Sequence, residues 1–451
     1  MLHRCAVFSG RINSIISGIE VSNRRHVSVT QVCSGFTWND AVTIRRDRTT
    51  GCPAGYTLIS GNICQLVSAD PFKNAGPSCP NGTNPINGGT GNKYQAEIDY
   101  TSSPGQGNIS FTRYYNSAVV YNGITLPTGL GEKWGHTFSR SALVFNNKTV
   151  ALRRPEGQVY FFNNVNGQWV TTADISETLI QTVDASNIPT GWRYTTKENS
   201  TEDYDTEGRL LAITFKSGLK HTLIYSCSPV STTCPVATPT SVALIPGILI
   251  KVTDNFGKSL NFTYNSSGQM TTMTDPEGKV TNYGYDVSGN LSTVTYPDDT
   301  PADLTNNPHR TYIYGELAHT ASVSQPKALT GLIDENGVRY ATWTYDASGK
   351  AVSSEHAEGV EKHSLNYASD GSNTAITDPL GSIRTTYFTT VLGWSKAPAA
   401  TSPPALAAMP PPAPSLTTPT ATSPAGPIST AIRRPTPTIL AATSKPAAPK
   451  A

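Results

Sequence analysis

Glycine recurs every ten to twelve residues through much of the second half of this 451-residue chain, and this spacing constrains the fold more than any other feature. The glycines form one early pair and two longer runs. They are Gly208 and Gly218, then Gly257, Gly268, Gly278 and Gly289, then Gly337, Gly349, Gly359, Gly371 and Gly381. A fixed period over such a span indicates a repeat architecture, in which each unit packs on its neighbours.

Two kinds of turn surround these glycines. Asp or Asn at the first turn position accepts local backbone hydrogen bonds, proline presets φ where it follows, and glycine supplies a positive φ. In the first kind a tyrosine leads the turn: Tyr204, Asp205 and Gly208; Tyr264, Asn265 and Gly268; Tyr285, Asp286 and Gly289; Tyr345, Asp346 and Gly349. In the second kind the pattern is Asp-x-x-Gly: Asp254 and Gly257; Asp275 and Gly278; Asp334 and Gly337; Asp378 and Gly381.

The residues between the turns favour β-strands. Segments 270–274, 280–285 and 340–345 are rich in β-branched and aromatic residues that roughly alternate with polar ones. The spacing leaves about seven residues for each strand and predicts about a dozen antiparallel strands. Because open sheets rarely exceed about ten strands without curling, the sequence predicts an all-β fold whose antiparallel sheet curls into a solenoid or shell. The repeated Tyr, Asp and Gly residues are assigned structural roles only.

The repeat units resemble the RHS or YD-repeat family, and the resemblance extends upstream of them. The segment Asn-Pro-Ile-Asn-Gly-Gly-Thr-Gly-Asn-Lys-Tyr at 84–94 is similar to the opening of the domain that commonly leads into RHS repeats. Ser-Phe-Thr-Arg-Tyr-Tyr-Asn-Ser at 110–117, Gly-Leu-Gly-Glu-Lys-Trp-Gly-His at 129–136 and Arg-Pro-Glu-Gly at 154–157 follow in the family's order. The resemblance covers roughly residues 80–394.

This resemblance implies a secreted or cell-surface bacterial protein whose repeats wind into a hollow β-shell. In many family members the shell encloses a C-terminal toxin used in competition between bacteria, and eukaryotic relatives use similar shells in adhesion. The partners it implies are a toxin cargo absent from this chain, or components of a secretion system. The chain shows few repeats, and neither the family's closing segment nor a cargo domain is recognisable. A truncated member of the family is therefore expected.

Composition and motifs divide the chain into four regions. They are a cysteine-containing start (1–79), a β-rich leading domain (80–203), the repeats (204–394) with insertions near 219–253 and 296–333, and a tail (395–451). The tail holds 14 of the 33 prolines and no acidic or aromatic residue. Such a segment cannot bury a core, so it is predicted to be disordered. A flexible linker and the product of a shifted reading frame would both explain it.

Cysteine spacing favours disulfides. Cys52 and Cys64 bracket a short loop, while Cys227 and Cys234 flank a Ser/Pro/Thr-rich insertion, so both pairs suit local disulfides in an exported protein. A structural zinc site is the alternative, although the sequence has no Cys-x-x-Cys pair and no histidine at ligand spacing. The cysteines left without an assigned partner are Cys5, Cys33 and Cys79.

Charge disfavours nucleic-acid binding by this chain, and hydropathy disfavours a membrane span. The net charge is +2, but the tail carries five basic residues and no acidic one, so the rest of the chain has 29 basic against 32 acidic residues. A slightly acidic body argues against nucleic-acid binding. The longest apolar run, at 242–250, is too short to span a bilayer, and residues 1–22 lack the clean hydrophobic core of a signal peptide. No membrane span is predicted.

The sequence contains no recognisable catalytic motif: no Gly-x-Ser-x-Gly, Walker A or His-Glu-x-x-His. A hairpin at Gly359 could bring His356 and His363 together as a metal or acid–base pair, but a hairpin carrying charged side chains is the simpler interpretation. His136 is interpreted as a packed core histidine. The sequence thus predicts a non-enzymatic shell scaffold without cofactor or metal. The alternative is an adhesion module whose strand Tyr, Trp and Asn side chains bind carbohydrate.

Overall fold

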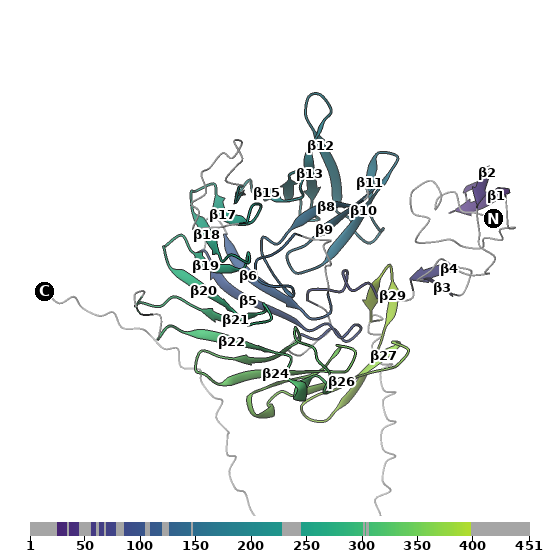
Figure 1. Cartoon of the computed structure of the whole chain (residues 1–451). Helices are drawn as coiled ribbons and strands as arrows, with labels where there is room; N and C mark the ends of the chain where they lie inside the picture. The colour runs from purple at the N-terminus through teal and green to yellow at the C-terminus, as the bar shows by residue number, and fades with distance from the viewer. Residues whose placement is uncertain are drawn as a thin grey trace, which may run out of the picture. The chain divides into compact units, whose positions relative to one another are not determined.

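The stretches between the glycine turns form one large antiparallel sheet in the computed structural model of this chain (Figure 1). The described residues all belong to one compact unit, Met1–Pro398. They are residues 25–33, 36–44, 56–59, 63–66, 69–77, 85–103, 109–119, 126–145, 148–227, 245–300, 303 and 306–397. For the first four of these segments only the backbone is described.

Seventeen strands make up the large sheet, which we call the repeat sheet. They are β12 (Thr178–Val183), β13 (Pro189–Thr195), β14 (Thr201–Tyr204), β15 (Leu210–Thr214), β16 (Lys220–Tyr225), β17 (Leu249–Asp254), β18 (Ser259–Tyr264), β19 (Met270–Thr274), β20 (Val280–Tyr285), β21 (Leu291–Thr295), β22 (His309–Tyr314), β23 (Leu329–Ile333), β24 (Arg339–Tyr345), β25 (Ala351–His356), β26 (His363–Tyr367), β27 (Asn373–Thr377) and β28 (Ile383–Tyr387). Each strand pairs with the next along the chain, and the sheet is not closed by pairing of β12 with β28.

The remaining strands form smaller sheets. They are the hairpins β1 (Arg25–Cys33) with β2 (Phe36–Ile44), β3 (Tyr56–Ile59) with β4 (Ile63–Leu66), and β29 (Thr389–Val391) with β30 (Trp394–Lys396); the three-stranded sheet β5 (Tyr94–Thr101), β6 (Ser110–Asn116) and β7 (Trp134–His136); and the four-stranded sheet β8 (Ser141–Phe145), β9 (Thr149–Arg153), β10 (Val159–Val165) and β11 (Gln168–Val170). Helix in the described part of the chain is confined to two 3-10 turns, η1 (Leu317–His319) and η2 (Ala357–Gly359). The predicted all-β fold with an antiparallel repeat sheet is confirmed.

The repeat sheet has more strands than the glycine spacing predicts. Strands β12 and β13 lie within the predicted leading domain, ahead of the first tyrosine-led turn. Strand β16 and all but the last residue of β17 lie within the predicted insertion at 219–253, and β22 and β23 lie within the one at 296–333. The period misses β12 and β13 because Asn187 (φ +61°), and not glycine, occupies the positive-φ position of the short turn between them. It misses the other two pairs because long connections replace the short glycine turns, whereas antiparallel pairing needs only that the two strands meet in space.

The two predicted kinds of turn share one geometry. At Asp275, the carboxylate Oδ1 accepts hydrogen bonds from the backbone N–H groups of Glu277 (2.9 Å) and Lys279 (2.8 Å), two and four residues further on. The same pair of bonds is made by Asp254, Asn265, Asp286, Asp334, Asp346 and Asp378. Asp205 accepts from Arg209 N. The glycines Gly208, Gly268, Gly278, Gly289, Gly337, Gly349 and Gly381 all have φ between +74° and +87°.

Tyrosines at the ends of alternate strands form hydrogen bonds to the neighbouring strand along one rim of the sheet, where β16, β18, β20, β22, β24 and β26 end. Each hydroxyl donates to the backbone carbonyl of the first residue of the strand before it. The bonds run from Tyr225 to Leu210 (3.0 Å), Tyr264 to Leu249 (2.5 Å), Tyr285 to Met270 (2.8 Å), Tyr314 to Leu291 (2.7 Å), Tyr345 to Leu329 (2.9 Å) and Tyr367 to Ala351 (2.6 Å). Because these bonds repeat on one face and at one rim, we call this feature the tyrosine ladder.

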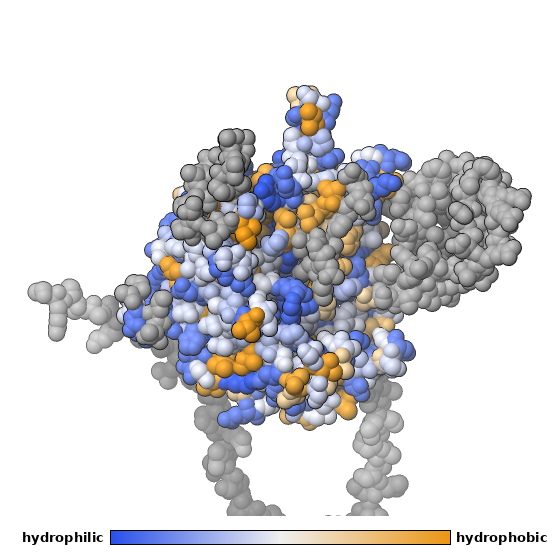
Figure 2. All heavy atoms as spheres, viewed as in Figure 1, coloured by the Kyte–Doolittle hydropathy of each residue, from blue (hydrophilic) through white to orange (hydrophobic). Residues whose placement is uncertain are grey.

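The hydrophobic core lies on the same face of the sheet as the tyrosine ladder. Strand side chains alternate, so that in β24 Ala341, Trp343 and Tyr345 are buried while the residues between them are partly or fully exposed. Strands β5 and β6 lie against β18–β22 in Figure 1, and side chains of β6 and β7 pack on this face of the sheet. The outer surface seen in Figure 2 is mainly hydrophilic with scattered apolar patches.

Candidate functional site

The candidate functional site is the interface between residues 85–138 and the repeat sheet. Aromatic rings from the two parts interlock there: the ring centroids of Phe111 and Phe262 lie 5.4 Å apart, and those of Trp134 and Tyr312 lie 5.2 Å apart, edge to face. The Trp134 indole also donates a 2.8 Å hydrogen bond to the Tyr314 hydroxyl. We call this region the filled face.

A buried ion pair lies at the centre of the filled face. Arg113 of β6 donates to Asp99 of β5 through Nε (2.6 Å) and Nη2 (2.9 Å), and the side chains of both residues are fully buried. Tyr283 donates its hydroxyl proton to the same carboxylate at 2.8 Å. The guanidinium also donates to the Tyr312 hydroxyl (3.0 Å) and lies 5.2 Å from the Trp134 ring centroid. These bonds join the leading strands to β20 and β22 in a single polar network.

The Gly-Leu-Gly loop before β7 binds the rim that carries the tyrosine ladder. The carbonyl of Gly129 accepts from Met270 N (2.8 Å) and from the Tyr285 hydroxyl (2.8 Å). A Cβ on Gly131 would lie 2.8 Å from Gly289 O, and one on Gly129 would lie 2.8 Å from the Tyr264 ring. Glycine is therefore explained by close approach to a backbone carbonyl at Gly131 and to a tyrosine ring at Gly129, in addition to positive φ at both.

The Asn-Gly-Gly-Thr-Gly segment makes the equivalent contact further along the sheet. The carbonyl of Gly91 accepts a 2.9 Å bond from the N–H of Ala351, the first residue of β25, and Thr374 Oγ1 donates to the carbonyl of Gly88 at 2.6 Å. A Cβ on Gly91 would lie 2.5 Å from Lys350 Cβ. The segments that resemble the family opening thus serve to dock the leading domain on the repeats.

A second buried charge cluster ties the β8–β11 sheet to the start of the repeat sheet. Glu202 of β14 is fully buried and pairs with both Arg140 and Arg154. Burial alone would raise the pKa of Glu202, but the two guanidinium charges outweigh it and lower this pKa to about 2. Tyr204, the first tyrosine of the repeats, donates its hydroxyl proton to Glu202 instead of to a carbonyl.

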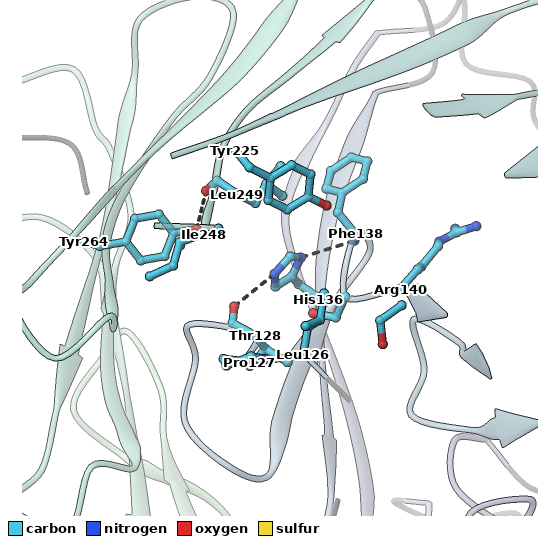
Figure 3. A pocket seen from close by; sticks show the side chains of 13 residues that line it. Leu126, Pro127, Thr128, His136, Phe138, Arg140, Tyr225, Ile248, Leu249 and Tyr264 are labelled. Atoms are coloured by element: carbon cyan, nitrogen blue, oxygen red, sulfur yellow. Dashed lines mark hydrogen bonds between the residues drawn. The ribbon is translucent and has the colours of Figure 1, made fainter. Parts of the chain in front are cut away.

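His136 lines a small pocket between β7 and the β16–β18 region (Figure 3). Its Nδ1 accepts from Phe138 N (3.2 Å), and its Nε2 lies 3.1 Å from the carbonyl of Thr128. Burial, assisted by the charge of Arg153, lowers the pKa of His136 to about 3, so the ring is neutral at physiological pH. The cavity volume is about 40 Å³, which suits one or two water molecules. Both ring nitrogens are engaged, as in a packed core histidine.

The other residues considered in the sequence form no reactive cluster in the described part of the chain. His356 Nε2 lies 3.5 Å from Glu361 Oε2, and His363 Nδ1 lies 2.9 Å from the carbonyl of Glu361. No group of three or more His, Cys, Asp or Glu side chains among the described residues could hold a metal ion. The same residues include no helix long and apolar enough to cross a membrane.

Of the four cysteines in the candidate disulfides, only Cys227 has a described side chain. Cys227 is disulfide-bonded. Cys52 and Cys234 lie outside the described residues, and Cys64 is described only as backbone in β4, where it pairs with Leu58. The pairs Cys52–Cys64 and Cys227–Cys234 therefore stay predictions.

Sequence reasoning missed the most connected residues of the site. Arg113 lies inside the segment at 110–117 that carries the family resemblance, but its partner Asp99 lies fourteen residues earlier in a strand without any motif. An arginine flanked in alternation by aromatic residues, Phe111 and Tyr115, was the available signal, because a buried cation requires a partner.

Fold and interface together define a β-repeat scaffold with a docked leading domain. The family model described as "RHS Repeat" matches residues 249–280 and 264–301, and the one described as "Domain of unknown function (DUF6531)" matches residues 83–162. The chain thus carries RHS repeats, preceded by a segment similar to the DUF6531 domain.

Similar solved structures are larger and distant. They include "Crystal Structure of TcdB2-TccC3 without hypervariable C-terminal region" (14% identity, 66% of this chain and 14% of that chain, TM-score 0.22) and "Crystal Structure of TcdB2-TccC3" (12% identity, 67% of this chain and 20% of that chain, TM-score 0.22). The chain thus spans a fifth or less of these two structures, and at such TM-scores the similarity carries no argument. No curated protein matches the chain.

Proposed function

We propose that this chain is a non-enzymatic scaffold of an exported, toxin-associated RHS-repeat protein, and that its described repeats form a solid end of that scaffold. The observation that carries the proposal is the filled face. The resemblance implies a hollow interior, but the described residues between 85 and 138 pack against β18–β25 through buried rings, an ion pair and glycine carbonyls. The cavity beside His136, at about 40 Å³, is far too small for a folded cargo.

The hydrogen bonds of the repeat residues also favour a structural role for the repeats. The hydroxyls of the tyrosine ladder donate to backbone carbonyls, and the turn carboxylates accept backbone N–H groups, so both residue types are engaged in holding the sheet. The association with toxin cargo, the export and the secretion-system partners come from the family resemblance. A secreted or cell-surface location is part of this proposal.

The experiment is affinity purification of the tagged full chain from its native bacterium after mild cross-linking, with mass spectrometry of the captured polypeptides. The proposal expects a toxin polypeptide or a secretion component that is retained by the wild-type chain. The variant Arg113→Met, which disrupts the filled face, is the matched control and should retain less. Capture of the same polypeptides in equal amount by both proteins would contradict a role for the filled face.

Carbohydrate adhesion is the competing outcome. The ladder tyrosines offer little to a sugar, because they are buried or partly buried and their hydroxyls are already bonded. Saturable binding of the full chain on a glycan array, without any captured toxin polypeptide, would replace the scaffold proposal by the adhesion module.

A further inference from the structure

The two ends of the open repeat sheet are connected by side chains instead of by strand pairing. The Lys73 ammonium donates to Thr172 Oγ1 (2.7 Å) and Asp174 Oδ2 (3.0 Å), which lie just before β12. It also donates to the carbonyl of Leu392 (2.7 Å), just after β28. The indole Nε1 of Trp394 in β30 donates to the same Asp174 carboxylate at 2.5 Å.

One backbone bond and two bonds of the Asn74 side-chain amide hold the β29–β30 hairpin to the segment that carries Lys73. Asp70 N and Asn74 Nδ2 both donate to the carbonyl of Gly393 at 2.8 Å, and Ser395 N donates to Asn74 Oδ1 at 3.0 Å. The hairpin and the segment with Lys73 are joined to the residues just before β12 by hydrogen bonds between fewer pairs of residues than join them to each other. The contact before β12 is centred on Asp174, which receives both Lys73 and Trp394.

The ion pair at this contact is well shielded from water. The exposed fraction of the side chain is 8% for Lys73 and 13% for Asp174. A charged pair held out of water and given several hydrogen bonds is far harder to replace than an exposed one, because each partner left alone would be an uncompensated, partly buried charge.

We propose that Lys73 and Asp174 form a latch across the seam between β12 and β28, and that the scaffold opens first at this seam when the latch is released. All successive strands from β12 to β28 are joined by backbone hydrogen bonds. The two end strands, β12 and β28, share no such bonds with each other. Local opening follows the connection with the fewest bonds. The latch is independent of what the scaffold binds, so it can be tested separately from the proposed function.

The test is hydrogen–deuterium exchange of the full chain, comparing wild type with Lys73→Met. Methionine keeps the approximate length of the side chain but removes the charge and the donors. Exchange in the segments 389–396 and 170–177 should become about tenfold or more faster, while exchange in β18–β22 stays unchanged. The matched control is Lys197→Met, because Lys197 is 69% exposed and only loosely paired with Glu198. It should leave all segments unchanged.

A second variant covers the case in which Lys73→Met does not fold. Asp174→Asn preserves the side-chain shape while removing the charge that Lys73 and Trp394 share, and the same local acceleration is expected. Unchanged exchange at 389–396 in a folded variant would overturn the latch. Acceleration of β18–β22 to the same extent would overturn it too, because the contact would then support the whole sheet and not the seam.

Discussion

Arg113 and Asp99 form a bidentate ion pair inside the filled face, with Nε–Oδ2 and Nη2–Oδ1 distances of 2.6 and 2.9 Å and both side chains inaccessible to solvent. Both residues belong to the leading strands, yet three tyrosines of the repeats surround them: Tyr283, Tyr296 and Tyr312. Neither the leading strands nor the repeats alone would bury this pair, so docking and charge burial depend on each other.

The first prediction concerns this pair. Arg113→Met should lower the free energy of unfolding by about 3–5 kcal/mol, because it leaves the Asp99 carboxylate buried without its cation. Arg193→Met is the control: Arg193 also pairs with a carboxylate, Asp203, but half of its side chain is exposed, so a loss below about 1 kcal/mol is expected. Urea unfolding of the three proteins measures the difference, and equal losses would contradict the assigned role.

The second prediction is a pH dependence carried by Glu202. Its folded-state pKa of about 2 lies below its ordinary 4.5, so the ion pairs stabilise the protein above about pH 4.5, and this contribution is lost as the pH falls toward 2. Glu202→Gln has no carboxyl group to titrate at this position, so it lacks this pH-dependent contribution to stability. The difference in unfolding free energy between wild type and Glu202→Gln should therefore shrink by about 3 kcal/mol between about pH 6 and about pH 2. Denaturation series at several pH values test this; a constant difference would contradict it.

The third prediction separates backbone strain from close approach. Gly91 and Gly278 have nearly equal φ, +77° and +83°, but a Cβ on Gly91 meets Lys350 at 2.5 Å whereas one on Gly278 meets nothing within 4 Å. Both alanine variants should lose about 1–2 kcal/mol to left-handed strain. Gly91→Ala should lose about 1–3 kcal/mol more from the clash. Thermal unfolding of the two variants provides the comparison, and matching melting temperatures would disprove docking at Gly91.

The fourth prediction addresses the tyrosine ladder. Tyr345→Phe removes the donor to the carbonyl of Leu329 in a buried setting, so a loss of about 1–3 kcal/mol is expected. Tyr340, in the same strand, is 47% exposed, and Tyr340→Phe should change stability by less than about 0.5 kcal/mol. If the two substitutions have the same effect on the urea midpoint, the ladder bonds add nothing to stability.

The fifth prediction is the disulfide pairing. Cys227 is disulfide-bonded, and the short sequence separation favours Cys234 as its partner. Peptide mapping of the unreduced protein by mass spectrometry should yield one linked peptide that contains both residues. A free thiol at Cys234 would require a different partner for Cys227.

Much of the repeat sheet could be predicted because its signals are local. A turn such as Asp275 to Gly278 needs one acceptor side chain and one positive φ, and both are properties of residues within five positions of each other. Strands β16 and β17 were assigned to an insertion because no such turn joins them. The docking residues could not be identified, because Gly91 and Ala351 meet across 260 residues of chain.

The glycine period alone determined that this chain makes antiparallel strands, and its Tyr-Asp frame indicated the family. It could not determine whether the face of the sheet is empty or filled, since alternation shows only that one face is buried and not what covers it. The tertiary structure decided this by placing Phe111, Arg113 and Trp134 against the repeats and by joining the sheet ends through Lys73. These contacts link residues distant in sequence, so no local pattern records them.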